Sequence, residues 1–177
     1  MRFGYLFVTT DVVFDMVKSL NYIMWWKNVY VKIPVTNSKG EFSGKAIRYL
    51  SHKNVKLNIT AVYTAQQTIK IIKNLNKKTK SIISIFAGRM SDVGKDPVPI
   101  FKKCVKLSKK YNKIQILWAS TREPYNFIQA NQMNCDIITM PAGIIEKVSK
   151  FGKSFQSLTI DTVKKFLIDS KESNFKL

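Results

Sequence analysis

Short apolar segments recur along the chain near residues 5, 29, 56, 82, 114 and 136, at intervals of roughly 22 to 32 residues. Segments with apolar residues at helical spacing follow them. The apolar runs are nearly continuous, which is typical of strands buried on both faces of a parallel sheet. The pattern therefore predicts an α/β fold built from βα units.

The expected strands cover residues 4–9, 28–36, 55–60, 81–87, 114–120 and 136–140. The expected helices cover residues 11–26, 46–50, 65–76, 100–111, 124–133, a segment that begins at Pro141, and 159–168, with a polar loop at 88–99. An open doubly wound sheet and a (β/α)8 barrel share this rhythm. Because no Gly-x-Gly-x-x-Gly or P-loop motif follows any strand, the barrel is favoured, although only six units are visible.

Lys32 stands where a buried strand should not tolerate a cation. Val31 and Ile33 flank it and should point to the opposite face, because side chains alternate along a strand. Two interpretations remain open at this point. Lys32 is either an edge-strand lysine that reaches solvent or a reactive amine inside a cavity.

Polar residues gather where the later strands end, which is where barrel enzymes build their active sites. Strand parity places these side chains on the same interior side as Lys32: Asn58, Thr60, Phe86, Trp118 and Ser120. Arg89 and Arg122 follow two of the strand ends, where they could clamp a phosphate through their forked donors.

One amine, one amide, hydroxyls and two arginines at a single mouth suit chemistry on a phosphorylated carbonyl compound. A lysine attacks a ketone only when it is unprotonated, and lowering its pKa from about 10.4 to near 7 requires roughly 4 to 5 kcal/mol. Apolar surroundings such as Phe86 and Trp118 would contribute to this shift. The mechanism indicated is nucleophilic catalysis through a Schiff base.

Ordinary structural roles compete with each of these assignments. Asn58 and Thr60 could hydrogen-bond a loop, and Ser120 could cap a helix. Arg89 could be a solvated loop charge. Arg122 could pair with Glu123 or Asp136.

Composition changes this interpretation little. The formal net charge is +19, but the lysines are spread over nearly every segment and only four of the 30 basic residues are arginine, so we expect no nucleic-acid function. Cys104 and Cys135 are far apart, and His52 is the only histidine, so neither a disulfide framework, a zinc site nor a histidine-based triad is expected. With neither a membrane span nor a secretory signal evident, a cytoplasmic location is the default expectation.

Five segments resemble, in order and spacing, the transaldolase family, and in particular its small transaldolase and fructose-6-phosphate aldolase branch. They are VKIPVT at 31–36, LNITAVY at 57–63, SIFAGRMSDVG at 84–94, WASTR at 118–122 and DIITMP at 136–141. The resemblance implies a class I aldolase of carbohydrate metabolism, in the pentose phosphate pathway, that transfers or releases a dihydroxyacetone unit of sugar phosphates. It implies a Schiff base on Lys32, substrate contacts from Asn58, Thr60, Phe86 and Ser120, and a phosphate held by Arg89 and Arg122. No metal or organic cofactor is expected.

The chain also departs from the family pattern. The family's first strand, with an aspartate that acts as acid and base through water, and its second strand, with a Thr-Thr-Asn-Pro-Ser type motif, have no counterpart here, and Phe7 aligns where a glutamate or glutamine normally reaches the site. We therefore expect residues 1–177 to form a single, N-terminally truncated barrel domain of about six βα units. The alternative function is a catalytically impaired member that at most binds sugar phosphates. Open strand edges and an amphipathic terminal helix make a homo-oligomer possible.

Overall fold

The computed structural model describes residues 4–7 and 29–173 of the chain. Six parallel strands form one sheet, in which the spatial order follows the order along the chain. The strands are β1 (Gly4–Phe7), β2 (Val29–Pro34), β3 (Leu57–Val62), β4 (Ser81–Phe86), β5 (Ile114–Ala119) and β6 (Ile137–Ile138). The predicted helix at 11–26 lies outside the described residues.

Seven helices are present in the described part of the chain. They are α3 (Gly44–His52), α4 (Ala65–Asn74), α5 (Ala87–Ser91), α6 (Val98–Ser108), α7 (Tyr125–Gln132), α8 (Ala142–Val148) and α9 (Phe155–Glu172). Residue Thr64 begins α4 with a capping box, because its hydroxyl accepts from the Gln67 amide while the Gln67 side chain accepts from the Thr64 amide. No helix among the described residues is both long and apolar enough to span a membrane.

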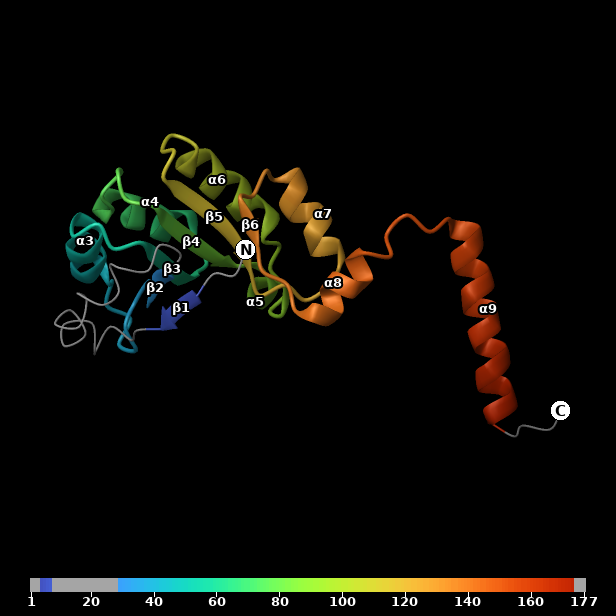
Figure 1. Cartoon of the computed structure of the whole chain (residues 1–177). Coiled ribbons are helices and arrows are strands. Elements are labelled where there is room, and N and C mark those ends of the chain that lie inside the picture. The colour runs from blue at the N-terminus through green and yellow to red at the C-terminus, as the bar shows by residue number, and fades with distance from the viewer. Residues whose placement is uncertain (1–3, 8–28, 174–177) are drawn as a thin grey trace.

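The helices α3, α4, α6 and α7 cover one face of the sheet, as Figure 1 shows. The main core lies between these two layers, where Ile33, Ile59, Ile83 and Ile116 from neighbouring strands are fully buried. Their register places them side by side across the sheet. The units that begin with β2, β3, β4 and β5 thus bury the apolar side of their strands under α3, α4, α6 and α7, as in a barrel wall.

A second, smaller cluster occupies the other face of the sheet. It contains Tyr30, Ile82, Leu117 and Ala119, with Phe86 and Ile137 packed against it. These residues alternate along their strands with those of the main core, so this face corresponds to the interior of a barrel. The inner face is therefore where the site predicted from the sequence has to lie.

The architecture is an α/β fold consistent with an incomplete (β/α)8 barrel. Within residues 4–7 and 29–173, β1 pairs only with β2 and β6 pairs only with β5, so the sheet has two edges. The strand positions expected from the apolar runs are confirmed for all six strands. One local expectation was wrong: the region 88–99 is not all loop, because α5 starts directly at the end of β4.

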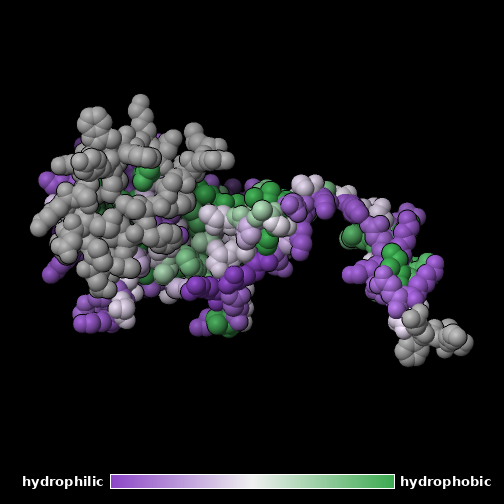
Figure 2. All heavy atoms as spheres, turned by 60° about the horizontal axis from the view of Figure 1, so that its bottom comes forward, coloured by the Kyte–Doolittle hydropathy of each residue, from purple (hydrophilic) through white to green (hydrophobic). Residues whose placement is uncertain are grey.

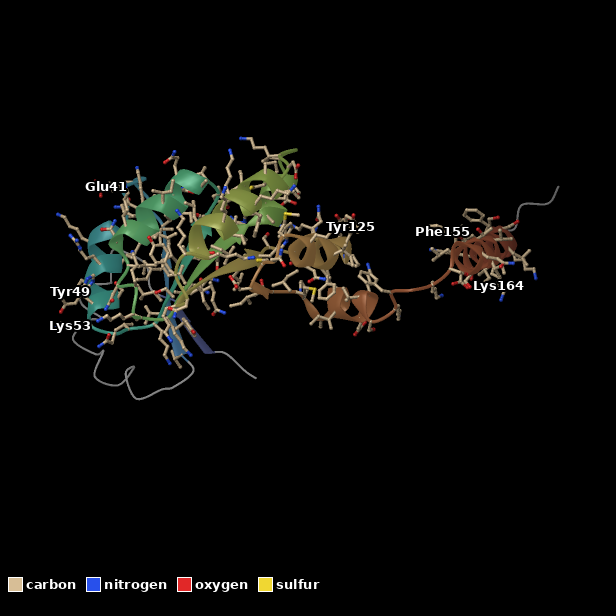
Figure 3. All side chains as sticks on the ribbon, turned by 90° about the horizontal axis from the view of Figure 1, so that it is seen from above. Glu41, Tyr49, Lys53, Tyr125, Phe155 and Lys164 are labelled. Carbon is tan, nitrogen blue, oxygen red and sulfur yellow. The ribbon has the colours of Figure 1, made fainter. Side chains whose placement is uncertain are left out.

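The last helix, α9, stands apart from the rest of the molecule. Figure 3 shows the labelled side chains Phe155 and Lys164 of α9 set away from the side chains of the sheet and its helices. Every residue of α9 for which burial is described is exposed, and Phe155 retains 88% of its accessible surface. Hydrophobic side chains gather on this helix in Figure 2. The chain segment 155–172 thus adds nothing to the core.

Candidate active site

Lys32 lies on the inner face of β2, and β2 is not an edge strand of the described sheet. In the register, Lys32 stands between Phe7 of β1 and Asn58 of β3. Its neighbours Val31 and Ile33 point into the main core, as the alternation along the strand requires. Half-burial of the ammonium lowers the pKa of Lys32 below its ordinary value. The edge-lysine interpretation is therefore wrong for this arrangement of strands.

Asn58 is held on the same face by a residue that the sequence did not single out. The hydroxyl of Ser84 on β4 donates to Oδ1 of Asn58 over 2.6 Å, and both side chains are almost fully buried. A buried amide that gains such a partner keeps one orientation. Its carbonyl oxygen is turned toward Ser84, so its Nδ2 donors remain for other partners. Ser84 could have been found by parity, because it precedes Phe86 by two positions.

Thr60 ends the row of polar residues on β3. The residue is 6% exposed, and its hydroxyl has no hydrogen-bond partner among the described residues. Such an orphaned buried hydroxyl is unusual and calls for a partner, such as a bound molecule. The alternative in which it hydrogen-bonds a loop is not realised in the described part of the chain.

The backbone just beyond Thr60 is strained. Ala61 has φ of 58°, and the pairing of β3 with β4 slips between Ile59 and Val62. A residue with a Cβ rarely adopts this left-handed conformation, and such outliers cluster at functional sites. The carboxyl end of β3, next to Thr60, therefore departs from regular strand geometry.

Phe86 is the last residue of β4 and forms an aromatic and cationic cluster. Its ring meets that of Tyr63 edge to face, with centroids 6.0 Å apart. The guanidinium carbon of Arg89 lies 5.6 Å from the centroid of the Phe86 ring, a cation–π distance. Because α5 starts immediately after β4, one turn of helix carries Arg89 back over the strand end.

Arg122 lies in the loop between β5 and α7, and its guanidinium forms a bidentate pair with Asp92. The Nε and Nη2 atoms donate to the Asp92 carboxylate over 2.6 to 3.1 Å. Hydrogen bonds from Arg122, and further the positive charge of Arg89, lower the pKa of Asp92. The alternative pairing of Arg122 with Glu123 or Asp136 is not realised: the Glu123 carboxylate accepts from Asn126 and the Asp136 carboxylate from the Ile116 amide. Both arginines therefore face one carboxylate.

Ser120 is locked by close backbone packing. It has φ of 63°, and its carbonyl oxygen lies only 1.6 Å from the position that a Cβ on Gly88 would occupy. Only glycine at 88 lets the start of α5 approach the end of β5 this closely. The residue that precedes α7 is Pro124, so Ser120 does not cap that helix. This contact ties the Arg89 turn to the loop that carries Arg122.

The comparisons with known proteins agree with these strand ends. Residues 8–177 match the family model described as transaldolase/fructose-6-phosphate aldolase. The chain belongs to this family. The predicted resemblance is thus confirmed over nearly the whole chain.

Three curated relatives in this transaldolase family match the chain with nearly the same identity and coverage. A probable transaldolase of Caldicellulosiruptor saccharolyticus is 31% identical over 145 residues, which cover 81% of this chain and 61% of that protein. A probable transaldolase of Methanococcus maripaludis is 31% identical over 81% of this chain and 61% of its own length. One of Thermoplasma volcanium is 32% identical over 82% and 60%. The chain thus spans about three fifths of the length of the curated relatives it matches.

One inner-face prediction for this transaldolase-family chain was wrong. Trp118 lies on the helix side of the sheet, fully buried, and its ring stacks on Phe101 of α6 at 4.3 Å between centroids. The inner face of β5 instead carries Leu117 and Ala119. The prediction put Trp118 and Ser120 on the same face, but Ser120 lies just beyond β5 and its left-handed backbone breaks the alternation of the strand. Trp118 is therefore a core residue and cannot line the site.

The site residues predicted for this chain fall into two groups, and strand β4 contributes to both. Lys32, Asn58 and Thr60 lie in register on β2 and β3, and Ser84 joins them from β4. Phe86, Arg89, Ser120 and Arg122 lie at the carboxyl ends of β4 and β5. No cluster of three potential metal ligands occurs among the residues that the structure describes.

Proposed function

We propose that this chain is a class I aldolase or transaldolase in which Lys32 forms a Schiff base with a dihydroxyacetone unit of a sugar phosphate. The observation that carries the proposal is the position of Lys32, a half-buried amine on the inner face of an interior strand. Burial disfavours the ammonium form, so a larger fraction of the side chain is the nucleophilic amine than for a solvated lysine. Membership of the transaldolase family supports this assignment.

The proposed covalent step balances without a cofactor. The Nζ lone pair of Lys32 attacks the ketone carbon, and the carbonyl oxygen takes up a proton to give a carbinolamine. Loss of that oxygen as water leaves an iminium ion. The hydroxyl on the carbon beyond the neighbouring carbon–carbon bond gives up its proton to water, and its O–H electron pair becomes part of the new aldehyde carbonyl. The iminium accepts the electron pair of the carbon–carbon bond that breaks, so an aldehyde leaves and an enamine remains. A new aldehyde gives transfer, whereas protonation and hydrolysis give release.

In this proposal the second group of residues binds the phosphate. Arg89 and Arg122 both face the Asp92 carboxylate, which marks a place where an anion is stabilised. A phosphate can accept the same bidentate hydrogen bonds from a guanidinium group as a carboxylate does, and it carries more negative charge. Asn58 would donate from Nδ2 to a substrate hydroxyl, and Thr60 would gain the partner that its hydroxyl lacks.

A second candidate function, a sugar-phosphate-binding member without turnover, is favoured by one observation. The strands β1 to β6 contain no aspartate or glutamate, so no strand presents a carboxylate beside Lys32. Proton transfer by a positioned group is worth typically about 10² to 10⁴ in rate. Without such a group the Schiff base could form while carbon–carbon bond cleavage stays slow.

Borohydride trapping tests the first proposal. The full-length protein is incubated with dihydroxyacetone or fructose 6-phosphate, reduced, digested and analysed by mass spectrometry. We expect one adduct, on the peptide that contains Lys32, and no adduct in Lys32→Met. The peptide that contains Lys77 is the internal control, because burial also lowers the pKa of Lys77 although it lies outside the site. We expect no adduct on that peptide. An adduct that persists in Lys32→Met would refute the covalent role.

Turnover separates the two candidate functions. Release of glyceraldehyde 3-phosphate from fructose 6-phosphate, coupled to a dehydrogenase, reports cleavage directly. Adduct formation together with release supports the aldolase or transaldolase. Adduct formation, or phosphate binding alone, with no release above the Lys32→Met background supports the binding protein.

We also propose that the protein associates with further copies of itself. The exposed apolar residues of α9, among them Leu158, Val163 and Phe166, support this, because a monomer leaves them in water. Sedimentation velocity of the full chain and of Val163→Glu tests it. A monomer at all concentrations in the unmodified protein would contradict self-association.

A further inference from the structure

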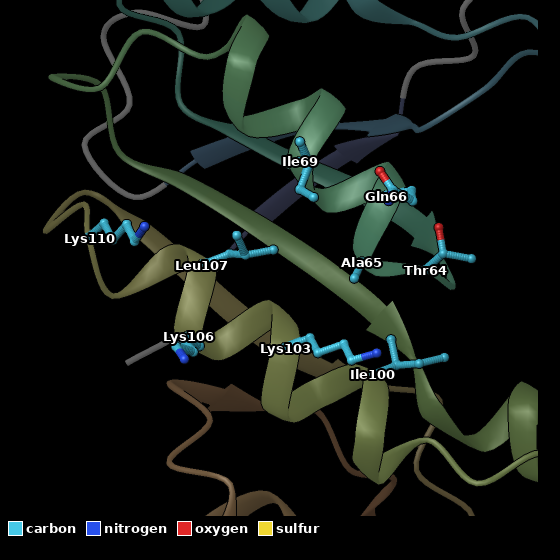
Figure 4. Close-up of a pocket in the computed structure, with 9 residues that line it drawn as sticks. All are labelled: Thr64, Ala65, Gln66, Ile69, Ile100, Lys103, Lys106, Leu107 and Lys110. Carbon is cyan, nitrogen blue, oxygen red and sulfur yellow. The ribbon is translucent and has the colours of Figure 1, made fainter.

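A groove of about 500 Å³ opens on the outer surface between α4 and α6, on the helix side of the sheet and away from the inner face. Figure 4 shows its lining, which comes from these two helices, the residue before α4 and Lys110 in the turn after α6. Below it the helices are fastened together by the contact between Thr68 and Cys104, at 3.3 Å between Oγ1 and Sγ. Both of these side chains are buried, so the floor of the groove rests on packed core.

The floor of the groove is apolar. It is formed by the partly buried side chains of Ala65, Ile69, Ile100 and Leu107. The two helices supply facing aliphatic groups along a strip that runs parallel to α6.

One side of the groove carries only positive charge. Lys103, Lys106 and Lys110 line it, all are exposed, and no aspartate or glutamate is among the lining residues. None of these lysines forms an ion pair with a described residue. The spacing of three places Lys103 and Lys106 on one side of α6, and Lys110 extends this row from the turn that follows the helix.

We propose that this groove binds an acidic amphipathic helix of a partner protein. A row of cations along α6 and the turn after it, beside an apolar strip, matches a helix whose apolar residues recur at i, i+3 or i+4 and i+7, with carboxylates along one flank. A compact anion would contact only one or two of the lysines and leave most of the strip in water. Charge complementarity steers the acidic flank toward α6 and fixes the direction in which the helix lies.

A synthetic helix provides the probe. A fluorescein-labelled peptide of about 15 residues, with leucine at the helical apolar positions and glutamate along one flank, is titrated with the full-length protein, and its anisotropy is measured. We expect saturable binding that weakens as salt is added, because the lysines are exposed to screening. A peptide of the same composition with scrambled order should bind far less well.

The chain offers a matched pair of variants. Lys103→Glu/Lys110→Glu reverses two charges that line the groove, one on α6 and one in the turn that follows it. Lys102→Glu/Lys109→Glu reverses two charges at the same spacing of seven, one on α6 and one directly after it, that do not line the groove. We expect about a tenfold loss of affinity in the first variant and little change in the second. Equal losses would mean general attraction to a basic protein and would overturn the proposal, as would the absence of binding to the unmodified protein.

Two further measurements locate the bound peptide and test whether another copy of the chain occupies the groove. Photo-crosslinking of the peptide to the unmodified protein should label α4 and α6, and labelling elsewhere would overturn the proposal even if a variant fails to fold. Sedimentation of the same variants without peptide tests self-occupancy. If only the groove variant changes the association state, the occupant is another copy of this chain and the partner-helix proposal is wrong.

Discussion

The guanidinium of Arg122 is bound by the carboxylate of Asp92, thirty positions earlier in the chain, through contacts of 2.6 to 3.1 Å. The pair joins the turn that carries Arg89 to the loop after β5. Both side chains are about half exposed, so the pair contributes little to the free energy of unfolding. Its importance is that a carboxylate already occupies the donors that a substrate phosphate would use.

Asp92→Asn should therefore tighten phosphate binding. Removing the carboxylate eliminates repulsion of the phosphate and releases the Nε and Nη2 donors of Arg122, so we expect the Kd of inorganic phosphate to fall by about three- to tenfold. Isothermal titration calorimetry at fixed ionic strength measures it. Asp96→Asn is the control, because it makes the same charge change at an exposed residue that instead accepts from the Val98 amide. Weaker binding in Asp92→Asn would show that Asp92 positions Arg122 rather than competing for it.

The rate of Schiff-base trapping should rise with pH. Burial lowers the pKa of Lys32, so the folded protein releases this proton at a lower pH than a solvated lysine does. The reactive amine therefore accumulates as pH rises through that lowered pKa, and the rate should level off below the ordinary value of about 10.4. Trapping rates with dihydroxyacetone between neutral and alkaline pH test this expectation. A rate that still climbs at the ordinary lysine pKa would contradict it.

Ser84→Ala should destabilise the protein and loosen Asn58. The variant leaves Oδ1 of a buried amide without its 2.6 Å donor, which costs about 1 to 3 kcal/mol. Urea unfolding measures this loss. In a double-mutant cycle, the combined Ser84→Ala/Asn58→Ala variant should lose less than the sum of the single variants, because the two side chains share one interaction. Strict additivity would mean that the hydrogen bond contributes nothing.

Gly88→Ala should be strongly destabilising, by about 3 kcal/mol or more. The new methyl group would sit 1.6 Å from the Ser120 carbonyl oxygen, so α5 and the loop after β5 would have to separate. Gly143→Ala in α8 is the matched control, since its methyl group meets nothing within 4 Å and favours the helix. Thermal unfolding of both variants tests the contrast, and equal melting temperatures would refute the close packing at Gly88.

The strands could be predicted because parallel strands buried on both faces leave an unmistakable apolar signal. The site was predicted well where the strand is regular, as for Lys32 and Asn58, because alternation then decides the face. The prediction failed at Trp118, which was placed on the same face as Ser120. The left-handed backbone of Ser120 breaks that alternation, and the sequence gives no sign of it. Asp92 as the partner of Arg122 could not be derived either, because it depends on α5 folding back over the strand end.

The isolation of α9 also determines how fast its backbone exchanges with solvent. The helix has 18 residues and a Ser154 cap, and all of its residues with described burial are exposed to solvent. Isolated helices of about this length are only marginally stable in water, so the amide hydrogens of α9 should exchange with deuterium orders of magnitude faster than those of β3 and β4. A protein surface that covers the helix would slow this exchange. The exchange rate of the α9 amides therefore measures directly whether the helix is docked.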